Sequence, residues 1–543
     1  MKSLLIALLS VALTLAANAQ ESAYSRAMAA YKKQDYPVAA KAFQEAFQTA
    51  GFGLNSTQLY DGACIYALNG DLEQALTILN YLAKERFYAN VDHIAKDSDL
   101  DKLHVLPAWT TLMQAVVHNK ETLPARMRDK AKIELLKAKR LLMADKGKRW
   151  GEQIWTDSIL VLTPDNTIYT LLPLPGASST DQVLYTKTLA NGVLSQTNTY
   201  QKYGDGSYAT VLTSYLTDSS ATIIHELFHR IQFAHKLFNG NPINYLDEYQ
   251  PREWLRLEYQ ALRNALQAVR TQQGKAKVAQ FVSDALRYRK LRQLLNTDLN
   301  AELEIETLEG LANYTGFVLS THPDKYQLAI AEITSREQAP TYTRTFPYAT
   351  GPAYGLLFDY LKIDWRKGLD KVYDFVKIYE AGYLHKSIST ATALVSAANA
   401  RNNFKAIHTE ETARKEAFEQ KIKNYTRLFV TQPTLSAMLK DDQYSMSYDM
   451  NGTLVLKDRG IVYTSIKGTD KSGKNFGSFK AENDNVLQQW GVMGDFKSKG
   501  FTFPLPIKIE GHKIIGTGFE ITLNKGWKVK QKNDKGDLEI VEE

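Results

Sequence analysis

The feature that most constrains the fold is the order in which helical and strand patterns follow one another along the chain. Residues 21 to about 115 carry a helical pattern, short strands are predicted from about 151 to 216, and a helical block continues to about 430. After Gln432-Pro433, β-branched and aromatic residues alternate around glycine-rich turns. Because 543 residues in this order exceed one ordinary core, we predict a multidomain α+β protein.

Residues 1–19 are predicted to be a cleaved signal peptide rather than part of the fold. Lys2 supplies the positive charge, Leu4 to Leu15 the apolar run, and Ala17-Asn18-Ala19 the small-residue cleavage site. The apolar run is shorter than the roughly 20 residues that span a bilayer. We therefore expect an exported protein, periplasmic or secreted, with no transmembrane span.

The charge and cysteine content exclude other classes of function. The formal net charge is +7, and its densest basic stretch, Lys130 to Arg149, also carries leucines in the pattern of an amphipathic helix. No recognisable nucleic-acid-binding module accompanies this charge, so we expect no nucleic-acid partner. Cys64 is the single cysteine, so no disulfide can form within one chain.

Residues 20–115 contain a faint internal repeat. Asp35 and Ala39 recur as Asp71 and Ala75, with the same offset of 36 residues, 35 to 71 and 39 to 75. Small alanines at matching positions allow paired helices to approach closely. The segment resembles a pair of tetratricopeptide repeats, whose period is about 34 residues. The resemblance implies an α-helical N-terminal domain that binds or positions a protein partner.

The segment with the clearest chemistry is Ile223-Ile224-His225-Glu226-Leu227-Phe228-His229. Positions i and i+4 lie on one face of a helix, so His225 and His229 can direct their imidazoles at one cation. Neutral imidazole suits zinc, and Glu226 stands where a carboxylate can take a proton from metal-bound water. The motif therefore predicts a Zn²⁺ site with Glu226 as general base.

Two imidazoles leave the zinc site incomplete, and a carboxylate on another helix is the expected third ligand. The favoured residue is Glu309, because Glu309, Ala312 and Gly316 share a helical face whose small side chains permit close approach to the histidine helix. The alternative is Glu258, which also shares a face with alanines. If Glu309 is the ligand, Glu258 is expected to orient an imidazole by accepting a hydrogen bond from the ring nitrogen that does not bind the metal.

These pieces resemble the gluzincin metallopeptidases. The matching residues are His-Glu-Leu-Phe-His at 225–229 and Glu-Gly-Leu-Ala-Asn-Tyr at 309–314. In that family the second segment supplies the third ligand, but at a much shorter interval than the 80 residues from 229 to 309 here. The resemblance implies a zincin-like α+β peptidase domain over residues 116–430. The alternating strand pattern after Gln432-Pro433 separately predicts a β-rich antiparallel domain over residues 431–543.

Hydrolysis of an amide also needs a group that stabilises the developing oxyanion. Tyr348, and after it Tyr354, lie downstream of the third ligand, roughly where aminopeptidase-type gluzincins carry such a tyrosine. The predicted strand 208–216 resembles the edge strand on which zincins bind an extended substrate. Both assignments are implied by the resemblance.

The resulting hypothesis is an exported zinc-dependent peptidase acting on a peptide or protein substrate. Two alternatives stay open. One is a non-catalytic envelope scaffold with a vestigial zincin domain and partner-binding repeats. The other is a zinc hydrolase of non-peptide amides. The intact Glu226 argues against the scaffold, which has no need of a base.

Overall fold

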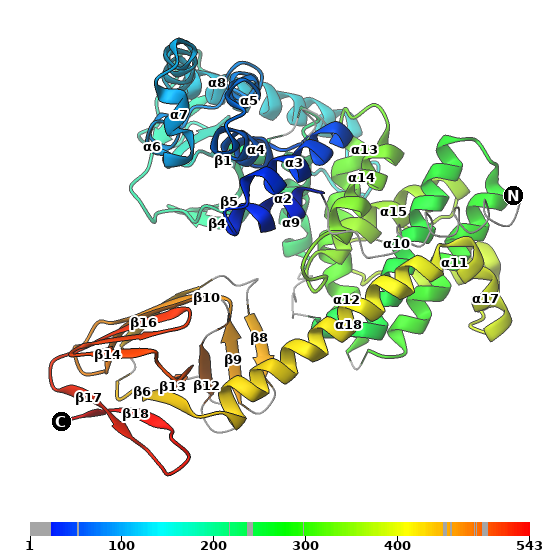
Figure 1. Cartoon of the computed structure of the whole chain (residues 1–543). Helices are drawn as coiled ribbons and strands as arrows, with labels where there is room; N and C mark the ends of the chain where they lie inside the picture. The colour runs from blue at the N-terminus through cyan, green and yellow to red at the C-terminus, as the bar shows by residue number, and fades with distance from the viewer. Residues whose placement is uncertain are drawn as a thin grey trace, which may run out of the picture. The chain divides into compact units, whose positions relative to one another are not determined.

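The computed structural model describes residues 23–50, 54–216, 218–235, 243–296, 298–366, 368–441, 443–448, 453–456, 459–482, 484, 486–490 and 498–543. The predicted signal peptide, residues 1–19, lies outside them. The chain divides into two compact units, of which the first ends at Ile407 and the second begins at His408 (Figure 1). The prediction of a mixed protein with a helical N-terminal region and a C-terminal β-sheet region is confirmed.

The first unit begins with helices, of which α2 to α5 pack on one another in sequence order. They are α2 (Ala23–Lys32), α3 (Tyr36–Ala50), α4 (Ser56–Asn69), α5 (Leu72–Lys84), α6 (Val91–Lys96), the short η2 (Ser98–Leu100), α7 (Asp101–His104) and α8 (Pro107–Asp145). Helix α2 packs against α3, and α4 against α5. The matching Ala39 and Ala75 are both fully buried, as expected where paired helices approach closely.

Helix α8 is shared between two hydrophobic cores. Its first part contributes Trp109, Leu112 and Val116 to the core of the N-terminal helices. Its second part contributes apolar residues, including Leu135 and Leu142, to the core that surrounds the candidate site. The helix continues without a break through position 115.

A five-stranded sheet follows in the order β3-β2-β1-β5-β4. Its strands are β1 (Ile159–Leu162), β2 (Thr167–Thr170), β3 (Tyr185–Thr188), β4 (Thr199–Tyr203) and β5 (Gly206–Leu212). The four residues of β1 are all fully buried, as its continuous apolar sequence predicts for a central strand. Strands β1 and β5 are parallel, and the other neighbours are antiparallel.

The prediction that strand 208–216 is the sheet edge is wrong. Strand β5 pairs with β1 on one side and with β4 on the other, so β4 is the edge. The sequence of β4, Thr-Tyr-Gln-Lys-Tyr, is too polar to be recognised as a strand by hydrophobic alternation.

The helical block after the sheet carries most of the site. It comprises α9 (Ala221–Ala234), η4 (Asn244–Asp247), α10 (Tyr249–Arg270), α11 (Lys275–Gln293), α12 (Leu299–Ile305), the π-helical turn η5 (Glu306–Gly310), α13 (Leu311–Leu319), α14 (Lys325–Glu337), α15 (Phe346–Leu361), α16 (Phe375–Tyr379), the π-helical turn η6 (Glu380–Leu384) and α17 (Thr392–Arg401). Helix α18 (Phe404–Thr426) follows, and the π-helical turn η7 (Arg427–Thr431) extends it. In the part of the chain that the structure describes, no helix combines the length and apolarity needed to cross a bilayer.

The second unit contains two sheets that share an aromatic core. One has the order β14-β15-β16-β11-β10-β7 and the other β17-β18-β6-β13-β12-β9-β8. The strands are β6 (Thr434–Met438), β7 (Tyr444–Tyr448), β8 (Thr453–Leu456), β9 (Gly460–Tyr463), β10 (Ser465–Asp470), β11 (Gly477–Glu482), β12 (Leu487–Trp490), β13 (Ser498–Pro504), β14 (Lys508–Glu510), β15 (Lys513–Gly516), β16 (Phe519–Leu523), β17 (Trp527–Gln531) and β18 (Leu538–Glu542). Phe479 of the first sheet packs on Phe501 and Phe503 of the second. The predicted antiparallel arrangement needs one correction, because β18 and β6 pair in parallel.

Candidate metal centre

Helix α9 presents the two histidines of the motif on a buried face. Its apolar residues, among them Ile224 and Phe228, belong to the large core of the first unit and fix the rotation of the helix. Its start is held by Ser220, whose Oγ donates to Glu134 Oε2 of α8 at 2.5 Å. As a result His225 and His229 point to the same side, with 3.0 Å between their Nε2 atoms.

Glu309 reaches the histidines from the π-helical turn η5. This turn crosses α15 where Gly310 meets Gly351, so closely that a Cβ at Gly351 would lie 2.2 Å from Gly310 Cα. The helix that follows, α13, packs against α9, and a Cβ at Gly316 would lie 2.7 Å from the Ala221 carbonyl oxygen. The small residues of this face therefore permit the close approach that the sequence predicted.

Three potential ligand atoms form a compact triangle. Glu309 Oε2 lies 3.5 Å from His225 Nε2 and 3.4 Å from His229 Nε2, and the third side is the 3.0 Å between the imidazoles. A tetrahedral zinc with bonds of about 2.0–2.1 Å holds neighbouring ligand atoms about 3.3 Å apart. The triangle therefore has the size of three corners of a zinc site.

A buried polar atom without a hydrogen bond also indicates that these three residues fit a metal ion. Glu309 Oε2 is buried and makes no hydrogen bond among the residues that the structure describes. A buried carboxylate oxygen without a hydrogen bond is costly, and a cation shared with the two imidazoles would satisfy it. Two histidines and one glutamate also form the ligand set of a catalytic zinc site that leaves one position open.

Gln232 links the histidine helix to the glutamate turn, and the sequence analysis did not identify it. Its side-chain nitrogen donates to the carbonyl oxygens of Thr307 and Leu308 at 2.9 and 3.0 Å. Because carbonyls only accept, the amide oxygen must face His229 Nδ1, 2.8 Å away, and this nitrogen must carry a hydrogen. His229 Nε2 then keeps its lone pair for a metal. The sequence signal that could have identified it is its spacing: residues three apart on a helix are neighbours, so Gln232 can contact the imidazole of His229.

The charges of the cluster depend on one another. Burial opposes the charged form of His229, but the Glu309 carboxylate beside it outweighs this effect and raises the pKa of His229 to about 9. Burial likewise disfavours ionised Glu309, but the two imidazoles beside it hold its pKa well below the usual value. Without a metal, a proton on His229 therefore compensates the Glu309 carboxylate.

Glu226 lies at the boundary between the cluster and a cavity of about 640 Å³. His225 and Glu226 both line this cavity, together with residues from α13, α14 and the segment before β4. Burial raises the pKa of Glu226, against the opposing charges of the two histidines. A carboxylate with a raised pKa beside an open cavity is suited to accept a proton near neutral pH.

Tyr348 lies beside the cluster. Its ring stacks on the imidazole of His225, with centroids 5.8 Å apart and an interplanar angle of 7°, and it lines the same cavity. Burial and the negative charge of Glu309 raise the pKa of its hydroxyl, which therefore keeps its proton as a donor.

Glu258 and Tyr354 lie elsewhere, in a separate charged network. Glu258 Oε1 accepts from Arg289 Nε at 2.7 Å and from the Tyr354 hydroxyl at 2.9 Å, and Oε2 accepts from Arg292 Nη2 at 3.2 Å. Within the described residues, neither Glu258 nor Tyr354 contacts the imidazoles of the cluster. Tyr348 and Tyr354 are six residues apart on α15, which places them on different faces of the helix.

A second group of potential ligands lies in the N-terminal helices but suits zinc poorly. Cys64 Sγ and one oxygen each of Asp97 and Asp99 lie within 4.8 Å of one another. Tyrosine hydroxyls donate to both carboxylates, Tyr60 to Asp97 and Tyr31 to Asp99. Burial strongly raises the pKa of the Cys64 thiol, so it is not the thiolate that binds metals.

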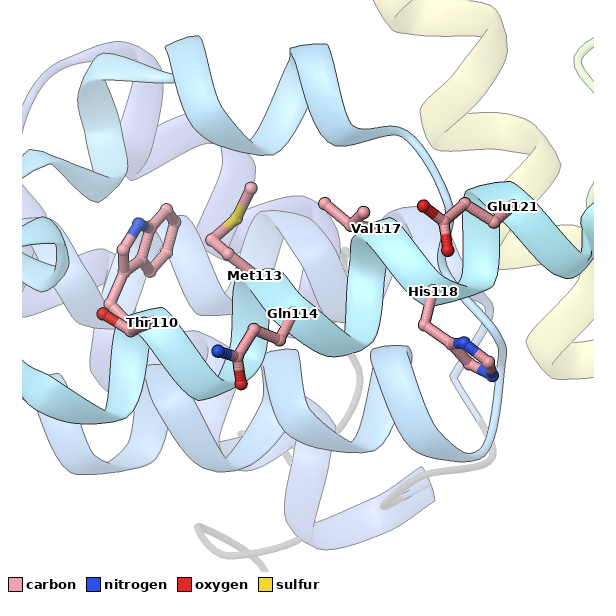
Figure 2. Close-up of a pocket in the computed structure, with 7 residues that line it drawn as sticks. Thr110, Met113, Gln114, Val117, His118 and Glu121 are labelled. Carbon is pink, nitrogen blue, oxygen red and sulfur yellow. The ribbon is translucent and has the colours of Figure 1, made fainter.

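A hollow of about 490 Å³ on α8 offers only two side chains of the types that bind zinc, His118 and Glu121. The residues that line it, including Met113, Val117, His118 and Glu121, all come from this one helix (Figure 2). Among the described residues, the group of His225, His229 and Glu309 is therefore the one in which donor type, burial and distance agree with zinc.

Comparison with known proteins gives no family. No family model, no curated protein and no solved structure matches this chain.

Proposed function

We propose that this protein is an exported zinc-dependent peptidase that hydrolyses peptide bonds with water. One observation carries the proposal: His225, His229 and Glu309 converge three donor atoms beside a cavity that Glu226 also lines. When bound, zinc supplies a Lewis acid that polarises a carbonyl and makes water a nucleophile at neutral pH.

The residues of the chain would divide the remaining work. The Glu226 carboxylate accepts the proton of the attacking water and delivers it to the departing amine nitrogen. The Tyr348 hydroxyl donates a hydrogen bond to the carbonyl oxygen as it becomes negative. Gln232 keeps His229 in the tautomer that presents Nε2 to the metal.

The finer architecture belongs to the same proposal. Residues 1–19 would direct export, residues 20–115 would form tetratricopeptide-like repeats that bind a protein partner, and residues 116–430 would form a zincin-like domain of gluzincin type. Residues 431–543 would form an accessory β domain. The paired helices α2–α3 and α4–α5 support the repeats.

The test is a Glu226→Gln variant of the mature, zinc-loaded chain, assayed with a mixed peptide library. The amide keeps the shape of the side chain but loses the base, so cleavage should fall about 10²- to 10⁴-fold. Zinc content should stay at that of wild type, because Glu226 is not one of the converging donors. Glu121→Gln, at an exposed position on α8, is the matched control.

Two outcomes would contradict the proposal. Equal cleavage by wild type and Glu226→Gln would remove the proposed base. A wild-type protein that binds zinc but cleaves no peptide, with or without chelator, would favour the non-catalytic scaffold.

A further inference from the structure

The ionisable side chains that line the cavity beside Glu226 set the charge that a substrate would meet there. Its ionisable side chains, apart from His225 and the tyrosines Tyr215 and Tyr348, are Glu226, Glu332, Arg336 and Arg344. A side chain that already forms an ion pair within the chain is less able to bind a charged substrate, so the partners of each arginine matter.

Arg336 is already neutralised and held in place. Its Nε donates to Glu332 Oε1 at 2.7 Å, one helical turn away on α14. Its guanidinium also lies over the ring of Tyr348, 4.7 Å from the centroid. This arginine and its glutamate therefore support the tyrosine that stacks on His225 and contribute no net charge to the cavity.

Arg344 is not neutralised. It lies just before α15, four residues ahead of Tyr348, and its side chain is exposed to the cavity that it lines. Among the residues that the structure describes, it makes no hydrogen bond, ion pair or ring contact. In a zinc-loaded site the two positive charges of the metal would be balanced by Glu226 and Glu309. Arg344 would then be the remaining charge.

We propose that Arg344 selects substrates that carry a carboxylate next to the bond that is cleaved. This inference rests on the proposed peptidase function and names its substrate class. A guanidinium binds a carboxylate through two parallel hydrogen bonds, which fixes both position and orientation. The carboxylate belongs either to an aspartate or glutamate side chain or to the free C-terminus of the peptide.

The experiment compares matched peptides on the zinc-loaded wild type, Arg344→Gln and Arg344→Lys proteins. Starting from any peptide that the wild type cleaves, one set replaces Glu by Gln and Asp by Asn at each position, and another replaces the free C-terminus by an amide. Hydrogen bonds to a charged group contribute about 1.5–3 kcal/mol. We therefore expect kcat/KM for the carboxylate-bearing peptide to fall roughly 10- to 100-fold in Arg344→Gln.

The controls separate selection from damage to the site. Neutral peptides should be cleaved by Arg344→Gln as by wild type, and zinc content should be unchanged. Arg344→Lys should fall between the two, because a lysine keeps the charge but loses the paired geometry. Arg140→Gln, which removes an exposed arginine on α8, should change nothing.

The outcomes distinguish this inference from the proposed function. Wild type that cleaves neutral and acidic peptides equally, or a preference that survives in Arg344→Gln, would overturn the role of Arg344 and leave the peptidase intact. A zinc-loaded wild type that cleaves no peptide would overturn both. If only the C-terminal amide matters, the carboxylate is that of the peptide terminus; if only Glu or Asp matters, it is a side chain.

Discussion

Two buried acidic clusters of the first unit neutralise their charges in different ways. Glu258 lies in a network with Arg289 and Arg292, its side chain is fully buried, and donors occupy both of its oxygens. Glu309 faces two imidazoles and the Tyr348 hydroxyl and no guanidinium in the described part of the chain. Its side chain is 21% exposed, and its Oε2 makes no hydrogen bond there.

The difference separates a structural cluster from a functional one. A guanidinium cannot lose its proton, so the arginine network is permanently charged and leaves no atom for a ligand. An imidazole can release its proton and offer a lone pair in its place. The histidine cluster can therefore exchange a proton for a metal ion, and the arginine cluster cannot.

The comparison is tested most strongly by exchanging each glutamate for glutamine. Glu309→Gln should reduce zinc affinity by more than about 100-fold. The loss of a metal ligand weakens binding more than the loss of a residue that only orients a ligand, which costs about 10- to 100-fold. Glu258→Gln should leave zinc affinity within a few-fold of wild type, because Glu258 is bound to arginines. Zinc titration against a competing chelator measures both. The reverse ranking would move the third ligand to Glu258.

Gln232 gives the next largest effect. Gln232→Leu removes the acceptor of His229 Nδ1 and both bonds to the η5 carbonyls. Zinc affinity should fall about 10- to 100-fold, as for other groups that orient a metal ligand.

Gln232→Glu separates the two tasks of this side chain. It keeps an acceptor for His229 but cannot donate to Thr307 and Leu308, so its affinity should recover toward wild type if imidazole orientation dominates. A Gln232→Leu protein that binds zinc as wild type does would remove Gln232 from the site.

The smallest expected effect concerns the pKa of His229 in the metal-free protein. The pKa of His229 is raised to about 9, so its imidazolium should persist at pH 8. The raised value means that this interaction stabilises the fold fully below pH 6.5 and is lost as the pH rises through about 9. Histidine-selective NMR of chelator-treated protein measures the titration. In Glu309→Gln the pKa should drop sharply, because the charge that raises it is gone. A His229 that titrates near 6.5 in the wild-type protein would contradict this account.

The sequence predicted those parts of the site that depend on helical periodicity. The i and i+4 spacing placed His225 and His229 together, and the small face of Ala312 and Gly316 identified the helix that brings Glu309 to them. Gln232 was not assigned: its spacing from His229 hints at contact with the imidazole, but its second role depends on carbonyls 75 and 76 residues away in sequence.

Parts that depend on tertiary partners were predicted less well. Glu258 and Glu309 look alike in sequence, and only the folded chain gives one arginines and the other histidines. Strand β4 escaped notice because pairing with β5, rather than its own polar residues, makes it a strand.

The long helix α8 couples the stability of the N-terminal helices to that of the core around the candidate site, two regions that the sequence pattern predicts as separate domains. The same rod buries Trp109 and Val116 in one core and Leu142 in the other, and its Glu134 holds Ser220 at the start of the histidine helix. Unfolding of the N-terminal helices would expose the apolar residues in the first part of α8. The packing of its second part on the other core would then weaken as well. In hydrogen exchange, amides of both cores should therefore become unprotected together, as one cooperative unit.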